Sequence, residues 1–401
     1  MGLFGKGWKR GFYPGNLSRR MNLFKYAIAV LLVLGGVSPV LCAGDSLASF
    51  LGKAVFEKQR LFDDQRYPNV VVTTRGTVMA VWGNDGVVVR RSADGGKSWG
   101  SVITVAKSGY SGGGTTVDAN SGDVLVFVED RQPPAPLTVY RSRDEGKTWQ
   151  AQSTVIAKDE LGNMPSMHMN EHGITLRHGK HKGRLIRPSR WYAGQNHSSK
   201  WPQHYTNAIY SDDGGKTWQT SEPFPANGTG EATIAELSDG TIYYNSRRHW
   251  AEEGANPRRR WTATSTDGGH TWENLTFCEV LPDGPQNTNY GCMAGLTRLA
   301  VKGRDILIYS NCDSPSGRVK GTVWASFDGG KTWPIKRLVF EGRHAYSSLT
   351  SGRPGTATEG MIIHHFEGGP KGGSAVARFN LAWILEGSTK TGDGEVPSDL
   401  N

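Results

Sequence analysis

The chain has 401 residues and a formal net charge of +9, from 46 Lys and Arg against 37 Asp and Glu. Residues 1–43 contain six of the basic residues and no acidic one, so subtracting six from nine leaves +3 for residues 44–401. So small a charge excludes the basic footprint of a nucleic-acid-binding protein, and we expect no nucleic-acid partner.

Residues 1–43 have the layout of an export signal. Basic residues precede an apolar run from Tyr26 to Leu34, and small residues follow as far as Ala43. The run is too short to span a bilayer, so we expect the segment to be removed and no stable membrane span to remain. SRRMNLFK at 18–25 resembles a twin-arginine signal, with Asn22 where an apolar residue is usual. The protein is therefore predicted to be periplasmic or extracellular, with a retained membrane anchor as the alternative.

Short β-branched runs follow one another through residues 44–386, and residues 387–401 form a polar C-terminal tail. No long segment keeps helical periodicity. Each of several runs predicts a strand or a hairpin: VVVTTRGTVMAVWG at 70–83, DVLVFVED at 123–130, TIYYNSR at 241–247 and DILIYSN at 305–311. The sequence therefore predicts an all-β domain over 44–386.

One eight-residue box, Ser-x-Asp-x-Gly-Lys/His-Ser/Thr-Trp, occurs five times. The copies begin at Ser92, Ser142, Ser211, Ser265 and Ser326, so they are 50, 69, 54 and 61 residues apart. The Asp can accept backbone hydrogen bonds across its own turn, Gly tolerates positive φ, and Trp can pack beneath the turn. We interpret the box as a structural turn rather than a ligand site. Its spacing predicts a six-bladed β-propeller in which one blade lacks a box.

Three cysteines follow the export segment, at positions 278, 292 and 312. Their spacing matches no metal site, and the spacing of His168, His172, His178 and His181 matches no helical ligand pair. We therefore expect no metal. One disulfide with one thiol left over and three buried thiols are both compatible with the sequence.

The boxes resemble the Asp-boxes of the sialidase (neuraminidase) family, and other stretches follow in that family's order over residues 55–385. They are QRYPNVV at 65–71, which resembles the Arg-Ile-Pro motif with Tyr67 in place of Ile; GEATIAELSDGTIYYNSR at 230–247, with a Glu and an Arg; the stretch 310–333, with another Arg; HAYSSL at 344–349, with a Tyr; and HHFEGG at 364–369, with a closing Glu.

The resemblance implies a site for the anomeric carboxylate of sialic acid. Arg66, Arg247 and Arg318 match the three arginines that bind it, and the planar guanidinium suits bidentate binding of carboxylate. Arg247 competes with Arg248, because adjacent side chains on a strand face opposite ways. Glu367 matches the residue that supports Arg66, with an ordinary surface carboxylate as the alternative.

The resemblance also implies catalytic residues. Tyr346 matches the nucleophile, whose neutral phenol avoids repelling the substrate carboxylate, and Glu231 matches its base. Glu236 competes with Glu231 and should face the other way on a regular strand.

The general acid of the family does not align cleanly. Its expected position falls on Gly86 in a shortened loop, and Asp85 is one residue away. A bulge could bring Asp85 to the site, whereas Asn84-Asp85-Gly86 is also a natural tight turn. Asp63 and Asp64 remain substitutes.

The resemblance predicts an exported exo-α-sialidase that uses no cofactor. It would cleave terminal α-linked sialic acid from glycoproteins, glycolipids or oligosaccharides with retention, through a tyrosyl-linked intermediate. One alternative is a related hydrolase or transferase for another acidic nine-carbon sugar. The other is a non-catalytic propeller that binds acidic glycans.

Overall fold

The computed structural model of the protein describes residues 47–111, 114–252, 254, 258–287, 291–369 and 372–400. The predicted export segment, 1–43, lies outside these ranges. Strands dominate the described part, and its helices are short: α1 (Leu47–Phe50), α2 (Leu381–Glu386) and the 3-10 helices η1 (Ser198–Gln203) and η2 (Ser398–Leu400). None of the helices described is long and apolar enough to cross a membrane.

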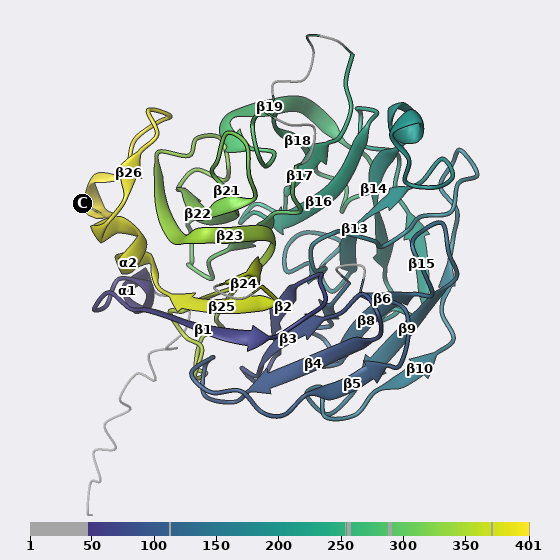
Figure 1. Cartoon of the computed structure of the whole chain (residues 1–401), viewed down its shortest axis with the longest axis horizontal. Helices are drawn as coiled ribbons and strands as arrows, with labels where there is room; N and C mark the ends of the chain where they lie inside the picture. Colours follow the sequence, from purple (N-terminus) through teal and green to yellow (C-terminus); the bar gives the residue numbers. More distant parts are fainter. Residues whose placement is uncertain are drawn as a thin grey trace, which may run out of the picture. The chain divides into compact units, whose positions relative to one another are not determined.

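Four separate sheets of four or five strands follow one another along the chain (Figure 1). The first contains β2 (Asn69–Val72), β3 (Val78–Trp82), β4 (Val87–Ser92) and β5 (Ile103–Ala106). The second contains β6 (Tyr110–Ser111), β7 (Thr116–Val117), β8 (Val124–Glu129), β9 (Leu137–Ser142) and β10 (Gln150–Gln152). The third contains β11 (Val155–Ile156), β12 (Ile174–Thr175), β13 (Leu185–Trp191), β14 (Tyr205–Ser211) and β15 (Thr217–Thr220). The fourth contains β16 (Thr229–Glu236), β17 (Ile242–Arg248), β18 (Arg259–Ser265) and β19 (Glu273–Pro282).

A fifth, eight-stranded sheet brings the two ends of the described chain together. It contains β1 (Phe56–Phe62), β20 (Gly295–Arg298), β21 (Leu307–Cys312), β22 (Val319–Ser326), β23 (Ile335–Ser351), β24 (Ile362–Gly368), β25 (Ser374–Phe379) and β26 (Thr389–Lys390). Figure 1 shows β1 beside β25, with which it pairs antiparallel from Phe56↔Phe379 onward. The first strand is thus hydrogen-bonded to one of the last.

The all-β, propeller-like fold is confirmed, but the prediction of six blades is wrong. Four sheets have the size of single blades, and the remaining strands share one larger sheet. The physical reason is the 17-residue strand β23, whose first half pairs with β22 and whose second half pairs with β24. The spacing of the boxes cannot reveal that one strand pairs with β22 along its first half and with β24 along its second.

The five boxes form one type of turn, as the sequence predicts. In the third box Asp213 accepts the backbone N–H groups of Lys216 and Thr217, each at 3.0 Å, and the Thr217 hydroxyl at 2.7 Å. Gly215 has a φ of +84°, and Trp218 is buried beneath the turn. The same backbone contacts recur at Asp94, Asp144, Asp267 and Asp328.

Apolar side chains pack between neighbouring sheets. Val71, Met79 and Val89 of the first sheet join Val124 and Val126 of the second in one buried cluster. Similar clusters join the later sheets, and one of them covers α1 and α2. The core is therefore distributed around the centre of the domain rather than gathered in one place.

The innermost strands run in the same direction. Their last residues line a single cavity of about 140 Å³: Val72 of β2, Val117 of β7, Thr175 of β12, Glu236 of β16, Arg298 of β20 and Ser351 of β23. Since the last residues meet at one end, the first residues of these strands meet at the other. That second end is where the candidate site lies.

Candidate active site

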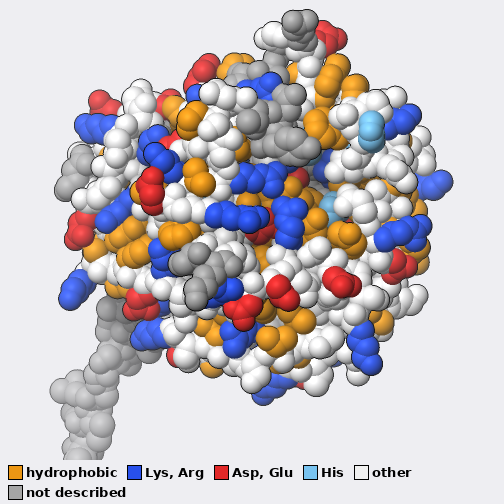
Figure 2. Space-filling model, viewed as in Figure 1, with side chains coloured by type: hydrophobic (Ala, Val, Ile, Leu, Met, Phe, Trp, Pro, Cys, Tyr) orange, Lys and Arg blue, Asp and Glu red, His pale blue; other side chains and the backbone are white. Residues whose placement is uncertain are grey.

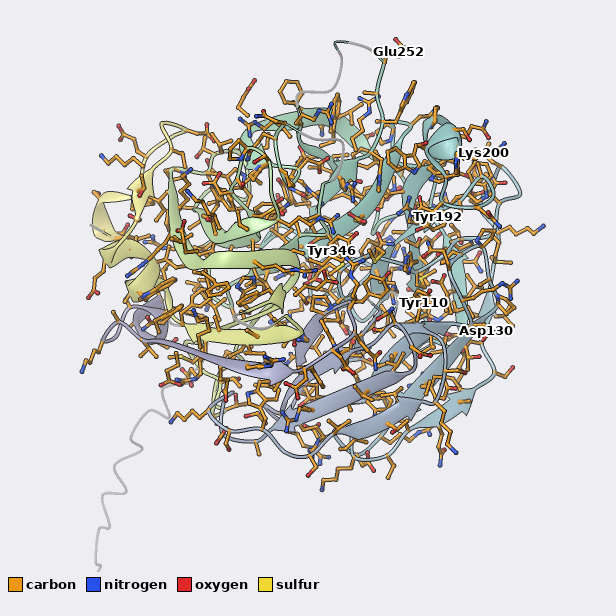
Figure 3. All side chains as sticks on the ribbon, in the orientation of Figure 1. Tyr110, Asp130, Tyr192, Lys200, Glu252 and Tyr346 are labelled. Carbon is orange, nitrogen blue, oxygen red and sulfur yellow. The ribbon has the colours of Figure 1, made fainter. Side chains whose placement is uncertain are left out.

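Three of the predicted site residues come from the beginnings of the innermost strands. Arg66 precedes β2, Glu231 is near the start of β16, and Tyr346 opens the second half of β23. Lys and Arg side chains gather near the middle of the face seen in Figure 2. In the view of Figure 3, Tyr346 lies near the centre, Tyr110 and Tyr192 lie close to it, and Asp130, Lys200 and Glu252 lie farther out.

Two guanidinium groups flank the ring of Tyr346. The Cζ of Arg66 is 4.9 Å and that of Arg318 is 4.8 Å from the ring centroid. The Tyr346 side chain is buried. The structure thus brings together two of the predicted carboxylate-binding arginines and the predicted nucleophile. Arg66 and Arg318 are 252 residues apart along the chain, and Tyr346 follows Arg318 by 28 residues.

Glu367 of β24 fixes the position of Arg66. Its two carboxylate oxygens accept the Nε and Nη2 groups of Arg66, each at 3.1 Å, and Oε1 also accepts the backbone N–H of Tyr67 at 3.1 Å. The Glu367 side chain is 4% exposed, whereas that of Arg66 is 38% exposed. Glu367 is therefore a buried support for Arg66 rather than a surface carboxylate.

Arg247, and not Arg248, reaches Glu231. The Nη1 of Arg247 donates to Glu231 Oε2 at 2.7 Å, and both side chains are 3% exposed. Arg248 faces the other way, with its guanidinium 4.3 Å from the ring of Trp261. The alternation expected on a strand therefore resolves this choice.

The same alternation separates Glu236 from Glu231. Glu231 pairs with Arg247, whereas Glu236, on the other face of β16, lines the cavity at the far end of the innermost strands. Glu236 accepts the backbone N–H groups of Arg177 and His178 at 2.7 and 2.9 Å.

Arg318 is positioned by the segment before β20. Its Nη2 donates to the carbonyl oxygen of Gly291 at 2.8 Å. A Cβ on Gly291 would lie only 2.1 Å from the carbonyl oxygen of Asp283 and 2.6 Å from Nε of Arg247. The Gly291 backbone therefore lies against two of the three arginines, and only glycine fits between Arg247 and the Asp283 backbone.

The electrostatics favour a protonated phenol and charged guanidinium groups. Burial and then the Glu231 carboxylate raise the pKa of Tyr346, although Arg318, Arg247 and Arg66 oppose the shift. Burial lowers the pKa of Arg66, but Glu367 and Tyr346 outweigh it and raise the pKa above its ordinary value. Tyr346 therefore needs a base before it can attack a substrate at neutral pH.

Asp85 lies in the tight turn between β3 and β4, and its side chain is exposed. The backbone N–H groups of Asn84 and Asp85 donate to Oε1 of Gln65, at 3.0 and 3.2 Å, so the turn is attached to the residue before Arg66. Within the described residues its carboxylate makes no hydrogen bond or ion pair. Asp63 and Asp64 are also exposed, and Asp63 pairs with Arg60. The structure thus places Asp85 close to the Arg66 segment but does not join it to Tyr346.

Sequence reasoning missed an aromatic wall beside Tyr346. The ring of Tyr67 stacks on that of Tyr346 with centroids 6.1 Å apart, and His168 meets Tyr67 edge-on at 5.3 Å and Tyr110 at 5.7 Å. Burial lowers the pKa of His168 well below its usual range, so it is neutral. One signal in the sequence could have revealed this wall: Tyr67 stands where the family motif has Ile.

The four histidines considered as metal ligands do not assemble into a metal site. His172 Nε2 lies 2.8 Å from the carbonyl oxygen of Leu349, and His168 packs in the aromatic wall. Across the ranges that the structure describes, no group of three or more His, Cys, Asp or Glu side chains is arranged to bind a metal ion.

Comparisons with known proteins identify the family of the chain. A family model described as "BNR repeat-like domain" matches residues 83–358. A sialidase of Micromonospora viridifaciens is 30% identical over 397 residues, which cover 88% of this chain and 58% of the relative. A sialidase of Bacteroides fragilis (strain YCH46) is 28% identical, covering 71% of this chain and 57% of the relative. The chain thus spans less than two thirds of the length of either relative.

Solved structures share the fold. The Hadza microbial sialidase Hz136 aligns with a TM-score of 0.61 at 23% identity, over 80% of this chain and 66% of that one. The intramolecular trans-sialidase from Ruminococcus gnavus, in complex with oseltamivir carboxylate, aligns with a TM-score of 0.60 at 16% identity, over 82% and 98%. Since the family model covers more than half of the chain and the matching relatives are sialidases, the chain belongs to the sialidase family with BNR repeats.

Proposed function

We propose that the protein is an exo-α-sialidase that hydrolyses terminal α-linked sialic acids from glycoproteins, glycolipids or oligosaccharides. The observation that supports it most strongly is the arrangement around Tyr346. Two guanidinium groups flank its ring at 4.8 and 4.9 Å, and a third, on Arg247, is paired with Glu231. Such a concentration of fixed positive charge beside a phenol suits a ketose that has a carboxylate on its anomeric carbon.

In this proposal the three arginines bind the substrate carboxylate. Arg66 is held by Glu367, Arg247 by Glu231, and Arg318 by the carbonyl of Gly291. Because these contacts exist before substrate arrives, binding requires little reorganisation of the guanidinium groups. The anomeric carbon, bonded directly to the carboxylate, then lies next to the phenol.

Tyr346 attacks the anomeric carbon and Glu231 accepts the phenolic proton. The attack displaces the aglycone and forms a tyrosyl-linked sialosyl intermediate, and water then cleaves that intermediate. Two displacements at one carbon give net retention. The raised pKa of Tyr346 explains why a base is required.

Asp85 is our proposed general acid for the departing aglycone. Support comes from its turn, which is attached through Gln65 to the Arg66 segment. Its exposure means that it would act from the solvent side of the site, where an aglycone leaves.

The exposed position of Asp85 also favours a second candidate. A site whose acid is displaced from the family position suits a related acidic nine-carbon sugar, or transfer of the sugar rather than hydrolysis. If neither reaction occurred, the arginines would serve a non-catalytic propeller that binds acidic glycans. We further propose that residues 1–43 direct export; fractionation of cells that express the full chain would test this by locating the protein.

The test of the proposed function is release of sialic acid from a fluorogenic α-sialoside. Tyr346→Phe should lower kcat at least about a thousandfold while KM changes little, because the phenol acts in the chemical step. Arg318→Ala should raise KM roughly a hundredfold, because a charged hydrogen-bonding partner of the carboxylate is lost. Arg337→Ala is a matched control, since that guanidinium packs 4.0 Å from the ring of Trp383 and away from Tyr346.

The outcomes separate the candidates. Release of N-acetylneuraminate supports the sialidase assignment. Release of only a deaminated analogue, or transfer to an added acceptor, supports the second candidate. Tight binding of an intact sialoside without turnover over a long incubation supports the non-catalytic binder.

A further inference from the structure

Two buried cysteines touch one another beside the candidate site. The Sγ atoms of Cys292 and Cys312 are 3.8 Å apart, and both residues are fully buried. Cys312 ends β21, and Cys292 lies just before β20, the antiparallel neighbour of β21. The two thiols belong to the same packed cluster as Tyr67 and Tyr346. The third described cysteine, Cys278, is only partly buried and belongs to a different cluster.

The backbone next to Cys292 connects two of the carboxylate-binding arginines. The carbonyl oxygen of Gly291 accepts Arg318, and the Cα of Gly291 faces Arg247 so closely that a Cβ there would clash. The N–H of Cys292 donates to the carbonyl of Asp283 at 2.9 Å. A displacement of Cys292 would therefore move the groups that orient both arginines.

We propose that Cys292 and Cys312 are a redox pair whose oxidation to a disulfide locks the Gly291–Cys292 segment and thereby fixes Arg247 and Arg318 for anion binding. The bond itself does not depend on the proposed function, whereas its consequence for substrate does. The oxidant is a low-molecular-weight disulfide such as glutathione disulfide. This pairing selects one of the two arrangements that the sequence left open, a single disulfide with Cys278 left over.

The chemistry is thiol–disulfide exchange. The thiolate of one cysteine attacks glutathione disulfide and releases one glutathione thiolate, and the other cysteine then attacks the mixed disulfide and releases the second. Two protein thiols are oxidised, one glutathione disulfide is reduced to two thiols, and the two protein protons pass to glutathione. Because both sulfurs are buried, exchange occurs during folding or when the segment opens locally, and the finished bond is shielded from reductant.

The groups around Cys292 favour it as the thiolate that attacks glutathione disulfide. Burial raises the pKa of Cys292, but the Cys312 thiol and the guanidinium groups of Arg318 and Arg247 outweigh it and lower the pKa below its ordinary value. For Cys278 burial raises the pKa to about 11, so it remains a thiol and reacts slowly. Cys278 is therefore the natural internal control.

The experiment begins with the full chain refolded in glutathione buffers of graded redox ratio, then quenched in acid, alkylated and digested. We expect a linked pair of peptides containing Cys292 and Cys312, with Cys278 alkylated, and about 5 °C higher Tm than the reduced protein. Cys312→Ser should abolish the linked peptide, and Cys278→Ser should leave it. Three alkylated cysteines at every redox ratio, or a link that includes Cys278, would overturn the proposal.

The locking effect is tested on wild-type protein, so no variant needs to fold. Deuterium uptake at the Cys292 amide should be at least about tenfold slower in the oxidised form, because local opening is suppressed. KM for a fluorogenic sialoside should be about three- to tenfold lower in that form, with kcat similar. Equal uptake in both forms would show that the bond does not lock the segment. Slower uptake with no turnover in either form would leave the redox pair standing and reject the proposed function.

Discussion

Replacing Glu367 with Gln is expected to weaken binding of the substrate carboxylate rather than the chemical step. The carboxylate of Glu367 accepts two hydrogen bonds from Arg66 at 3.1 Å and one from the Tyr67 backbone. An amide of the same shape keeps one acceptor oxygen but turns an NH₂ group toward the guanidinium or the backbone N–H. Arg66 would then lose its fixed orientation.

The magnitude follows from these contacts. A hydrogen bond to a charged group contributes roughly 1.5 to 3 kcal/mol, and the replacement disrupts at least one such bond. The Arg66 side chain is 38% exposed, so water compensates for part of the loss. We therefore expect a loss of about 2 kcal/mol, which corresponds to roughly a thirtyfold decrease in kcat/KM. Most of it should lie in KM, because in the proposed mechanism Arg66 would contact the carboxylate in the ground state and in the transition state alike.

The assay is steady-state hydrolysis of a fluorogenic sialoside, with Tm measured in parallel. Glu236→Gln is the matched control, because Glu236 is also a buried glutamate that accepts two backbone N–H groups, but at the far end of the innermost strands. Both variants should lose a few degrees in Tm, and only Glu367→Gln should raise KM. An unchanged KM in Glu367→Gln at the same loss of Tm would show that Glu367 does not position Arg66 for substrate binding.

Three further predictions concern other parts of the molecule. Asp213→Asn should lower stability by about 1 kcal/mol at pH 7, because a charged acceptor at a turn is lost. Burial raises the pKa of Asp213, but hydrogen bonds from Thr217 outweigh it and lower the pKa to about 2, so this stabilisation exists above the unfolded pKa near about 4 and disappears as the pH falls through about 2. The Tm difference from wild type should therefore close in acid, and a gap independent of pH would contradict it. Gly291→Ala should lower kcat/KM at least about tenfold, because its Cβ would meet the Asp283 carbonyl oxygen at 2.1 Å and Arg247 at 2.6 Å and so displace the segment beside both arginines, whereas a Cβ at Gly317 meets only ordinary contacts. Gly317→Ala should thus behave as wild type, and equal losses would refute the clash. Asp85→Asn should impair hydrolysis of sialyllactose far more than that of an aryl sialoside, whose leaving group needs no proton; equal effects on both would exclude Asp85 as the acid.

Local chemistry made much of the fold predictable. The Ser, Asp, Gly and Trp of each box have roles that are complete within eight residues, so their turn could be derived without any tertiary contact. The short β-branched runs predicted strands because their strand preference is also a local property of the sequence. The merging of strands in the fifth sheet was not predictable, because it depends on where the partners of β23 lie in space.

The candidate site was predictable only where a motif or an alternation rule applied. Alternation separated Arg247 from Arg248 on one strand and Glu231 from Glu236 on the next. Gly291 could not be recognised from the sequence. Its carbonyl oxygen accepts a hydrogen bond from Arg318, and its lack of a Cβ leaves room for Arg247, and neither property depends on a side chain. The contact between Cys292 and Cys312 likewise required the pairing of β20 with β21.

Covalent trapping of the enzyme tests most directly whether Tyr346 is the nucleophile in an arginine-lined sialidase site. The full chain would be incubated with a sialosyl fluoride that has an additional fluorine at C3, which slows breakdown of the intermediate, and then quenched and digested for mass spectrometry. We expect one modified peptide, with the fluorosialosyl group on Tyr346, and none in Tyr346→Phe. A sugar attached to any other residue, or active enzyme with no adduct at all, would contradict that expectation.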